Sequence, residues 1–312
     1  MRVFEEKELE KIYKPQDIAK GGNGQVTIIG GSSLFHGAPL LSLKTASRIV
    51  DMVFFTSPEP LVGEVAKKIK SKLFSFIWFP FSQVAEYIEK SDAILIGPGL
   101  MRYCQKTQNT KGKSQNWDKV GEETKKITEE LLRQFPQKQW VIDAGSLQVM
   151  DKNFISSKAR NKVPAEGRVL IPKNAILTPN KKEFKLLFQD DLSHYDTVQY
   201  HSEEQLEKTT FNLAERYHCI IVLKGEQTVV CSPDSCVRIE GGNTGLTKGG
   251  TGDVLAGLTV ALAAKNPPLL AACAASFIVK KAADELYQKV GFAYSADDLA
   301  EKIPEVLGRY FR

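Results

Sequence analysis

Short apolar runs alternate along the chain with longer segments in which apolar residues recur every three or four positions. The short runs end in glycine, proline or polar residues and predict buried strands, whereas the longer segments predict amphipathic helices. We expect strands at residues 25–31, 52–56, 74–79, 93–99, 140–143, 175–180 and 219–225, followed by a hairpin at 228–231 and 237–240. We expect helices at 40–50, 61–72, 84–90, 120–135, 202–217, 251–264, 269–290 and 296–310, and another that begins near 181–183.

The alternation of strands and helices predicts the α/β class, with one mainly parallel central sheet and helices on both faces. No internal repeat, low-complexity linker or break in composition divides the chain, so we expect one domain over residues 1–312. Residues 1–20 are polar and are expected to form an N-terminal extension. Two polar or basic stretches, 102–117 and 151–168, lack apolar periodicity and are expected to be long loops that act as lids or in assembly.

The composition is that of an ordinary globular protein, with 42% hydrophobic and 25% charged residues among 312. The net charge of +5 is compatible with small polyanionic ligands such as nucleotides. No basic stripe with interleaved aromatic residues predicts nucleic-acid binding. No stretch approaches the roughly 18 apolar residues of a membrane span, and the N-terminus lacks the apolar segment of a signal peptide, so we expect a cytoplasmic protein without membrane contact.

The cysteines form an odd set of five without Cys-x-x-Cys spacing, which fits a reducing compartment: Cys104, Cys219, Cys231, Cys236 and Cys273. Cys231 and Cys236 flank the turn signal Ser-Pro-Asp-Ser and face each other across the expected hairpin, but we do not expect them to form a disulfide. The four histidines have no metal-ligand spacing with the cysteines, so no metal-binding residue is predicted.

A glycine-rich segment at residues 243–257 stands directly before an expected apolar helix and contains one carboxylate, Asp253. Glycines at 249, 250 and 252 let backbone N–H groups approach a ligand closely, and the start of the helix adds partial positive charge, so the segment suits an anion. An acid at such a place suits a base that deprotonates a hydroxyl group as it attacks a phosphoryl group. The alternative is that Asp253 only caps the helix.

Four segments at the ends of expected strands are predicted to meet at one crevice, because the carboxyl ends of parallel strands line the ligand site. They are Gly97-Pro-Gly99, Thr178-Pro-Asn180 with Glu183, residues 224–227, and residues 243–253. Each signal is weak by itself, and the prediction depends on their order and spacing.

Five motifs together resemble the ribokinase-like superfamily, and specifically its nucleotide-dependent NAD(P)H-hydrate dehydratases. They are Ile28-Ile-Gly-Gly31, Ile96-Gly-Pro-Gly99, Leu177-Thr-Pro-Asn180 with Glu183-Phe184, Val222-Leu-Lys-Gly225, and Gly249-Gly-Thr-Gly-Asp-Val-Leu-Ala-Gly257. The likeness extends from about residue 20 to residue 300. The glycine–aspartate motif is shared with sister kinases, whereas its combination with Thr-Pro-Asn and Leu-Lys-Gly points to the dehydratase.

The resemblance implies a ribokinase-like fold and the dehydration of hydrated NADH and NADPH (NADHX and NADPHX) back to NAD(P)H. ADP or ATP would be the phosphoryl donor, with Mg²⁺. Hydroxide at C6 of the reduced ring is a poor leaving group, and phosphorylation of that hydroxyl, with Asp253 as base, would replace it by phosphate. We expect a homo-oligomer.

The resemblance also implies two sets of binding residues. The nucleotide would be bound by Lys224, Gly225, Glu226, Gln227, Thr228, Asn243, Thr244, Gly245, Leu246, Thr247, Lys248, Gly249, Gly250, Thr251 and Gly252. The hydrate would be contacted by Ala38, Gly99, Asn180, Lys181, Lys182, Glu183, Phe184, Lys185, Leu186 and Asp253, the last of which is also the catalytic residue.

Three of these side chains have a structural alternative. Lys224 can extend from a strand end so that its ammonium group reaches water. Glu183 either stabilises the start of a helix or orders Mg²⁺ or water. Lys248 either reaches a phosphate group or stays solvated.

The chain departs from the family pattern at two motifs. The family often has Asp-Ala-Asp-Ala where this chain has Asp143-Ala-Gly-Ser, which leaves the role of Asp143 open. It often has His-Pro-Gly-Glu where this chain has Asn180-Lys-Lys-Glu, a variant also found within the family. The alternative function is a ribokinase-like kinase of a vitamin precursor, of the hydroxyethylthiazole or pyridoxal type, which would release a stable phosphate ester. A nucleotide sensor is disfavoured because it would not need the base Asp253.

Overall fold

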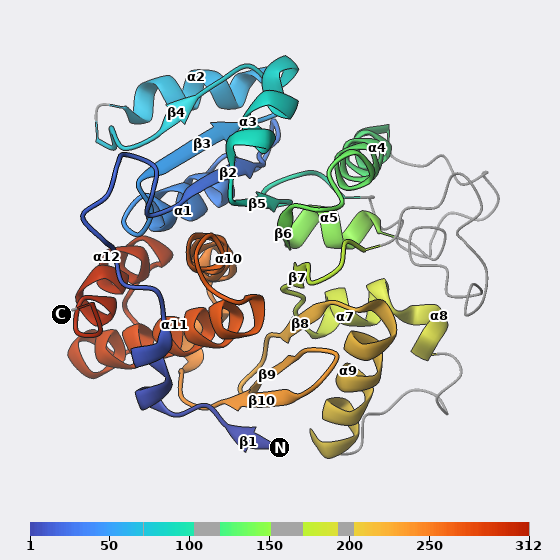
Figure 1. Ribbon diagram of the computed structural model, residues 1–312, viewed down its shortest axis with the longest axis vertical. Helices are drawn as coiled ribbons and strands as arrows, with labels where there is room; N and C mark the ends of the chain where they lie inside the picture. The colour runs from blue at the N-terminus through green and yellow to red at the C-terminus, as the bar shows by residue number, and fades with distance from the viewer. Residues whose placement is uncertain (71, 103–118, 151–170, 193–202, 312) are drawn as a thin grey trace.

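The computed structural model describes residues 1–70, 72–102, 119–150, 171–192 and 203–311 (Figure 1). Apart from residue 102, the two expected loops at 102–117 and 151–168 lie outside these ranges. Within the described residues, no helix is both long enough and apolar enough to cross a membrane.

A mixed sheet of ten strands runs through the described part of the chain, in the order β1-β10-β9-β8-β7-β6-β5-β2-β3-β4. The strands from β4 to β8 in this order pair in parallel, β9 is antiparallel to β8 and β10, and β1 is parallel to β10. The expected parallel sheet and hairpin are therefore confirmed. The strands are β1 (Arg2–Val3), β2 (Gln25–Ile29), β3 (Met52–Thr56), β4 (Ile77–Trp78), β5 (Ala93–Ile96), β6 (Gln139–Ile142), β7 (Ile176–Leu177), β8 (Ile220–Leu223), β9 (Thr228–Cys231) and β10 (Cys236–Ile239).

The expected helices are all present, and the structure adds the short helices α5 and α8, which are too brief to show helical periodicity. The α-helices are α1 (Gly37–Ala46), α2 (Pro60–Ile69), α3 (Val84–Lys90), α4 (Lys119–Gln134), α5 (Ala144–Val149), α7 (Lys181–Leu187), α8 (Gln189–Leu192), α9 (Glu203–Tyr217), α10 (Thr251–Ala263), α11 (Pro268–Val290) and α12 (Ala296–Leu307). The 3-10 helices are η1 (Glu6–Lys11), η2 (Phe81–Gln83) and η3 (Thr244–Thr247).

Side chains that alternate along the strands form two hydrophobic cores, one on each face of the sheet. In β5, Ala93 and Leu95 belong to the first core, while Ile94 and Ile96 belong to the second. Helices α1, α10, α11 and α12 cover the first face, and α3, α4, α5, α7 and α9 cover the second (Figure 1). The α/β class with helices on both faces is thus confirmed.

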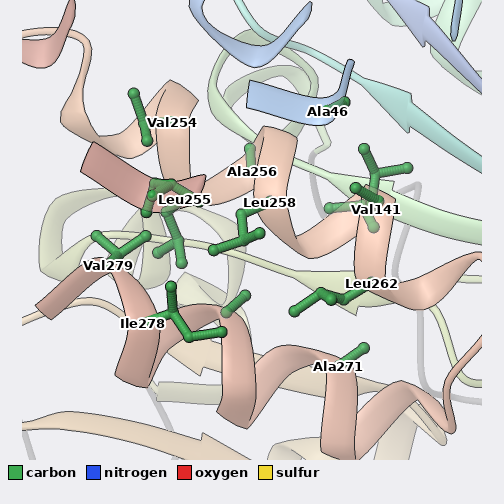
Figure 2. Close-up of a cluster of buried hydrophobic side chains, with 14 of the residues drawn as sticks. Ala46, Val141, Val254, Leu255, Ala256, Leu258, Leu262, Ala271, Ile278 and Val279 are labelled. Atoms are coloured by element: carbon green, nitrogen blue, oxygen red, sulfur yellow. The ribbon is translucent and has the colours of Figure 1, made fainter. Parts of the chain in front are cut away.

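Helix α10 lies at the centre of the first core. Figure 2 shows Leu258 and Leu262 of α10 directed toward α11, which contributes Ile278. On its other side α10 packs closely on α1, since a Cβ atom at Gly257 would lie 2.5 Å from the carbonyl oxygen of Ser42. These contacts fix the position of α10 and of its first turn at the carboxyl ends of the strands.

Two expected strands are shorter in the structure. The aromatic run at 74–79 pairs with β3 only at Ile77–Trp78, and the run at 175–180 is a strand only at Ile176–Leu177. Pro179 ends the second run, because a proline lacks the N–H group that a sheet ladder needs.

The N-terminal residues are folded into the molecule, which differs from the expected polar extension. Arg2–Val3 pair with β10, and Phe4, Leu9 and Ile12 are buried in the first core. These apolar residues are spaced too widely to form a recognisable strand or helix pattern, so the sequence did not reveal their burial.

The structure pairs Cys231 and Cys236 as a disulfide, so the expectation of two free thiols was wrong. The two residues are direct partners in the register of β9 and β10, with Cα atoms 4.1 Å apart. Their places opposite each other on the paired strands bring the two sulfur atoms within bonding reach. The odd number of cysteines, on which the expectation was based, does not show which two of them face each other across a hairpin.

Candidate active site

The parallel strands bring their following residues to one edge of the sheet. Asp143 follows β6, Thr178 follows β7 and Lys224 follows β8, and an isolated parallel bridge joins Asn180 to Lys224. The start of α10 reaches the same edge, because a Cβ atom at Gly252 would lie 3.4 Å from the Nζ atom of Lys224. Gly97, directly after β5, lies against Asp143, because a Cβ atom on it would lie 1.8 Å from the carbonyl oxygen of Asp143. The structure thus brings together the four segments that the sequence predicted to meet.

A lysine and two carboxylates form the centre of this edge. The Nζ atom of Lys224 lies 2.9 Å from Oδ1 of Asp143 and 4.0 Å from Oε2 of Glu183. Asp143 is 2% exposed, and its Oδ1 atom also accepts a 2.7 Å hydrogen bond from the hydroxyl of Thr178. Burial opposes the charge on Lys224, but the carboxylates around it raise its pKa above the usual value. Lys224 is therefore held beside these carboxylates, with 21% of its side chain exposed.

Asp253 completes the cluster from the first turn of α10. Burial, and next the negative charge of Asp143, raise the pKa of Asp253 to about 7, although Lys224 acts in the opposite direction. The residue at the N-cap of α10 is Gly250, without a side-chain cap bond, so Asp253 is not the cap of the helix. A carboxyl group with a pKa near neutrality is suited to accept a proton and release it again.

The carboxylate of Glu183 caps the start of α7. Its Oε2 atom accepts from the backbone N–H of Asn180, while the side chain of Asn180 accepts from the N–H groups of Lys182 and Glu183, which is a complete capping box. The other carboxylate oxygen accepts a 2.9 Å bond from Gln148, whose own oxygen accepts from Arg102. These bonds favour the structural role over metal binding.

The other residues expected to contact the hydrate differ in exposure. Lys181, Lys182, Lys185 and Leu186 are exposed on α7, and Ala38 is half-buried in α1. Phe184 is 1% exposed and packs edge-on against Phe188 in the second core, so any contact that it makes with a ligand would be made by its backbone. Its position in the helix points it inward, whereas the motif alone did not show which way each residue faces.

Gly99 has a packing reason for its lack of a side chain. Its φ of 71° is in the left-handed region, and a Cβ atom there would lie 2.6 Å from the carbonyl oxygen of Phe35. The residue therefore shapes the loop next to β5, and any contact with a ligand would be made by its backbone.

The glycines of the loop before α10 have different roles. Gly250 has φ 94°, and a Cβ atom on it would lie 2.5 Å from Leu41 and 2.8 Å from Ala296. A Cβ atom on Gly245 would lie 2.2 Å from the hydroxyl oxygen of Tyr294. Gly249, in contrast, has nothing within 4 Å of the place where a side chain would stand. Gly249 is the member of the loop next to open space that a phosphate group could occupy.

Asn243 holds the loop in shape with both ends of its side-chain amide. Its Nδ2 group donates to Asp284, and its Oδ1 atom accepts from the N–H of Gly245 and the hydroxyl of Tyr294. Lys248 is similarly occupied, because its ammonium group donates to the carbonyl oxygens of Phe292 and Tyr294. Neither alternative expected for Lys248, a phosphate contact or a solvated ammonium group, describes this arrangement.

The remaining predicted nucleotide residues lie on two stretches beside the cluster. Gly225, Glu226 and Gln227 are exposed between β8 and β9, and Thr228 is buried with its hydroxyl group donating to the carbonyl of Gly225. Thr244 and Thr247 are exposed in η3, Leu246 is half-buried, and Thr251 is buried with its hydroxyl group bonded to the carbonyls of residues 246 and 248.

Several residues of the site were not identified from the sequence. Asp143 was left without a role, Thr178 was placed at the crevice without a partner, and Gln148, Lys280 and Asp284 were not assigned to the site at all. The signal for the last two was present, since Lys280 and Asp284 are charged residues four positions apart in an expected helix, with Ala282 and Ala283 between them. Among the described residues, no group of three or more His, Cys, Asp or Glu side chains could hold a metal ion.

The fold and the site at its strand ends define the class of protein. A ribokinase-like superfamily protein of known structure from Enterococcus faecalis matches with a TM-score of 0.75, covering 99% of this chain and 96% of that one at 21% identity. The likeness shows a ribokinase-like fold. A sequence profile for NAD(P)H-hydrate dehydratases matches residues 26–305. The chain therefore belongs to the NAD(P)H-hydrate dehydratase family, as the five motifs indicated.

Two relatives differ in how much of their own length this chain covers. The bifunctional NAD(P)H-hydrate repair enzyme Nnr of Methanocaldococcus jannaschii is 34% identical over 298 residues, which are 92% of this chain and 49% of that protein. The ADP-dependent (S)-NAD(P)H-hydrate dehydratase of Nitrosopumilus maritimus is 26% identical, with 92% of this chain and 90% of that protein covered. The chain spans about half the length of the bifunctional relatives and nearly the full length of the dehydratase.

Proposed function

We propose that this protein catalyses the nucleotide-dependent dehydration of NADHX and NADPHX to NADH and NADPH. The observation that carries the proposal is Asp253, a carboxyl group in the first turn of α10 whose pKa is raised to about 7 by burial and by Asp143. The membership of the chain in the dehydratase family supports the choice of substrate.

The reaction consists of a phosphoryl transfer and an elimination. The carboxylate of Asp253 takes the proton of the C6 hydroxyl group while the hydroxyl oxygen forms a bond to the terminal phosphorus of ATP or ADP, and the bond from that phosphorus to the bridging oxygen breaks. Backbone N–H groups of residues 249–252 stabilise the charge that develops on the phosphoryl oxygens. The ring nitrogen then expels inorganic phosphate, and loss of the C5 proton restores the dihydropyridine.

The cluster around Lys224 supports this role of Asp253. The ammonium group stands beside Asp143, Glu183 and Asp253, so the site contains three acidic groups and one cation before any ligand binds. Burial, and next the negative charge of Asp143, make proton release from Asp253 harder, whereas Lys224 makes it easier. The balance places the pKa near neutral pH, where a base is most effective.

The nucleotide occupies the segments 224–228 and 243–252, with its phosphates next to Gly249. Magnesium enters this proposal as the counter-ion of the nucleotide phosphates, which is its usual mode of binding. The described residues offer no cage of carboxylates for it, and both oxygens of Glu183 already accept hydrogen bonds. A cytoplasmic location and a homo-oligomeric state are also part of the proposal and come from the sequence alone.

The experiment combines the protein with NADHX and either ADP or ATP and follows the recovery of dihydronicotinamide absorbance. We expect one inorganic phosphate per dihydronicotinamide recovered, and little nucleotide turnover without the hydrate. The Asp253→Asn variant is the negative control. If phosphate and dihydronicotinamide fail to appear together while hydroxyethylthiazole or pyridoxal gives a stable phosphate ester, the protein is a vitamin-precursor kinase and the proposal is wrong.

A further inference from the structure

Helix α11 carries a buried lysine and, one turn further on, an aspartate, and both contact the loops beside the site. Lys280 and Asp284 are one turn apart, and Lys280 is 5% exposed. Neither residue takes part in the reaction described above. A lysine that is nearly fully buried is unusual and calls for a physical reason.

The ammonium group of Lys280 joins two segments that are distant in the sequence. It donates a 2.6 Å hydrogen bond to the carbonyl oxygen of Glu226 and a 2.9 Å bond to the carbonyl oxygen of Gly241. Glu226 belongs to the first expected nucleotide segment, and Gly241 lies two residues before the second. Burial lowers the pKa of Lys280 to about 8, although the nearby carboxylates of Asp284, Glu226 and Glu240 act against this shift.

Asp284 holds the second segment from the same side of the helix. Its Oδ2 atom accepts from the N–H of Gly242 at 2.8 Å, and its Oδ1 atom accepts from Nδ2 of Asn243 at 2.9 Å. Gly241 and Gly242 both have φ in the left-handed region, at 86° and 83°. Two consecutive glycines leave the backbone free to adopt many conformations, so the course of this turn is set by its bonds to α11.

We propose that Lys280 and Asp284 are positioning residues of the nucleotide site, which hold segments 225–228 and 241–248 at the spacing that the nucleotide requires. The inference rests on the proposed function for the identity of the ligand. A purely packing role would be served by an apolar side chain of similar length, because burying a charge costs free energy that packing alone does not return. Lys280 instead donates hydrogen bonds to two backbone carbonyl oxygens, one on each segment.

The test compares Lys280→Met with Lys281→Met, its neighbour on the same helix. Lys281 points away, pairs with Glu6 at 3.2 Å and touches neither segment. We expect Lys280→Met to raise the Kd of ADP or ATP and the KM for nucleotide about tenfold or more, since two charge-assisted hydrogen bonds are lost. The KM for NADHX should change by less than about threefold, and Lys281→Met should leave both constants unchanged.

A second pair of variants keeps the inference testable if Lys280→Met does not fold. Asp284→Asn has the shape of the native side chain but turns an amide group toward a donor, and we expect the Kd of nucleotide to rise several-fold. Its control is Glu285→Gln, one residue further on, where the carboxylate pairs with Arg309 and Lys302 instead. Circular dichroism and urea unfolding establish that each variant is folded before binding is measured.

Two results would overturn the inference. One is an unchanged Kd of ADP and ATP in folded Lys280→Met and Asp284→Asn, measured by calorimetry without the hydrate. The other is an equal rise in the KM values for nucleotide and NADHX, which would indicate a general loosening of the fold. If the wild-type protein binds nucleotide but does not convert NADHX, the proposed function fails while the positioning role is still decided by the calorimetry.

Discussion

Replacing Asp253 by asparagine should abolish turnover and stabilise the fold at the same time. Burial, and next the negative charge of Asp143, raise the pKa of Asp253 from its ordinary 3.8 to about 7. The folded protein therefore holds this proton more tightly than the unfolded chain does. As the pH rises from about 4 through about 7, the unfolded chain loses the proton first, so the wild-type protein loses stability over that range.

The magnitude follows from the difference between the two pKa values. Each pKa unit corresponds to about 1.4 kcal/mol, so ionising Asp253 in the folded state costs at most about 4 kcal/mol at pH 8. Partial contact with water and the positive end of α10 both favour the charged form and reduce this cost. We therefore expect Asp253→Asn to be about 2 kcal/mol more stable than the wild type at pH 8, and about 1 kcal/mol or less at pH 4.5.

The assay is urea unfolding followed by circular dichroism at pH 4.5 and pH 8, together with kcat for NADHX. We expect kcat of the variant to fall about 100-fold or more, because a positioned base contributes on this scale. Asp297→Asn is the matched control: its carboxylate also lies in the first turn of a helix, α12, but is exposed and pairs with Lys44. The control should alter stability by less than about 1 kcal/mol at either pH. A variant at position 253 that is less stable than the wild type at pH 8 and retains near-normal kcat would refute the reasoning.

Three further predictions test the rest of the site. Lys224→Met removes the positive charge that lowers the pKa of Asp253. The pH at which kcat/KM reaches half its plateau should therefore move upward from about 7. An unchanged or lower midpoint would contradict the electrostatic argument. Gly250→Ala should destabilise the protein by about 1 kcal/mol or more, because φ is 94° and the new methyl group meets two side chains. In Gly249→Ala the new methyl group enters open space, so this variant should weaken nucleotide binding with little change in the urea midpoint of unfolding. Equal urea midpoints for the two variants would count against these roles. Asn180→Ala removes the N-cap of α7 and should cost about 1 kcal/mol in urea unfolding, whereas no loss would show that the capping box contributes nothing.

The sequence by itself determined the elements of the fold and the position of Asp253, the proposed base. Apolar runs such as β5 and β8, and the helical periodicity of α10 and α11, depend on neighbours a few positions away, so they can be recognised in the chain. The same is true of Asp253, because a glycine loop directly before an apolar helix is a local pattern. Parallel pairing then follows from the alternation of strands and helices.

Only the tertiary structure decided which side chains meet. The contact between Lys224 and Asp143 joins residues 81 positions apart, and that between Lys280 and the carbonyl of Glu226 joins residues 54 positions apart. Such contacts depend on the twist of the sheet and the packing of helices on it, and a change of less than 1 Å in that packing decides whether a hydrogen bond forms. The pKa of Asp253 near 7, the burial of Phe184 and the Cys231–Cys236 disulfide are consequences of the same long-range packing, and for that reason the local pattern did not contain them.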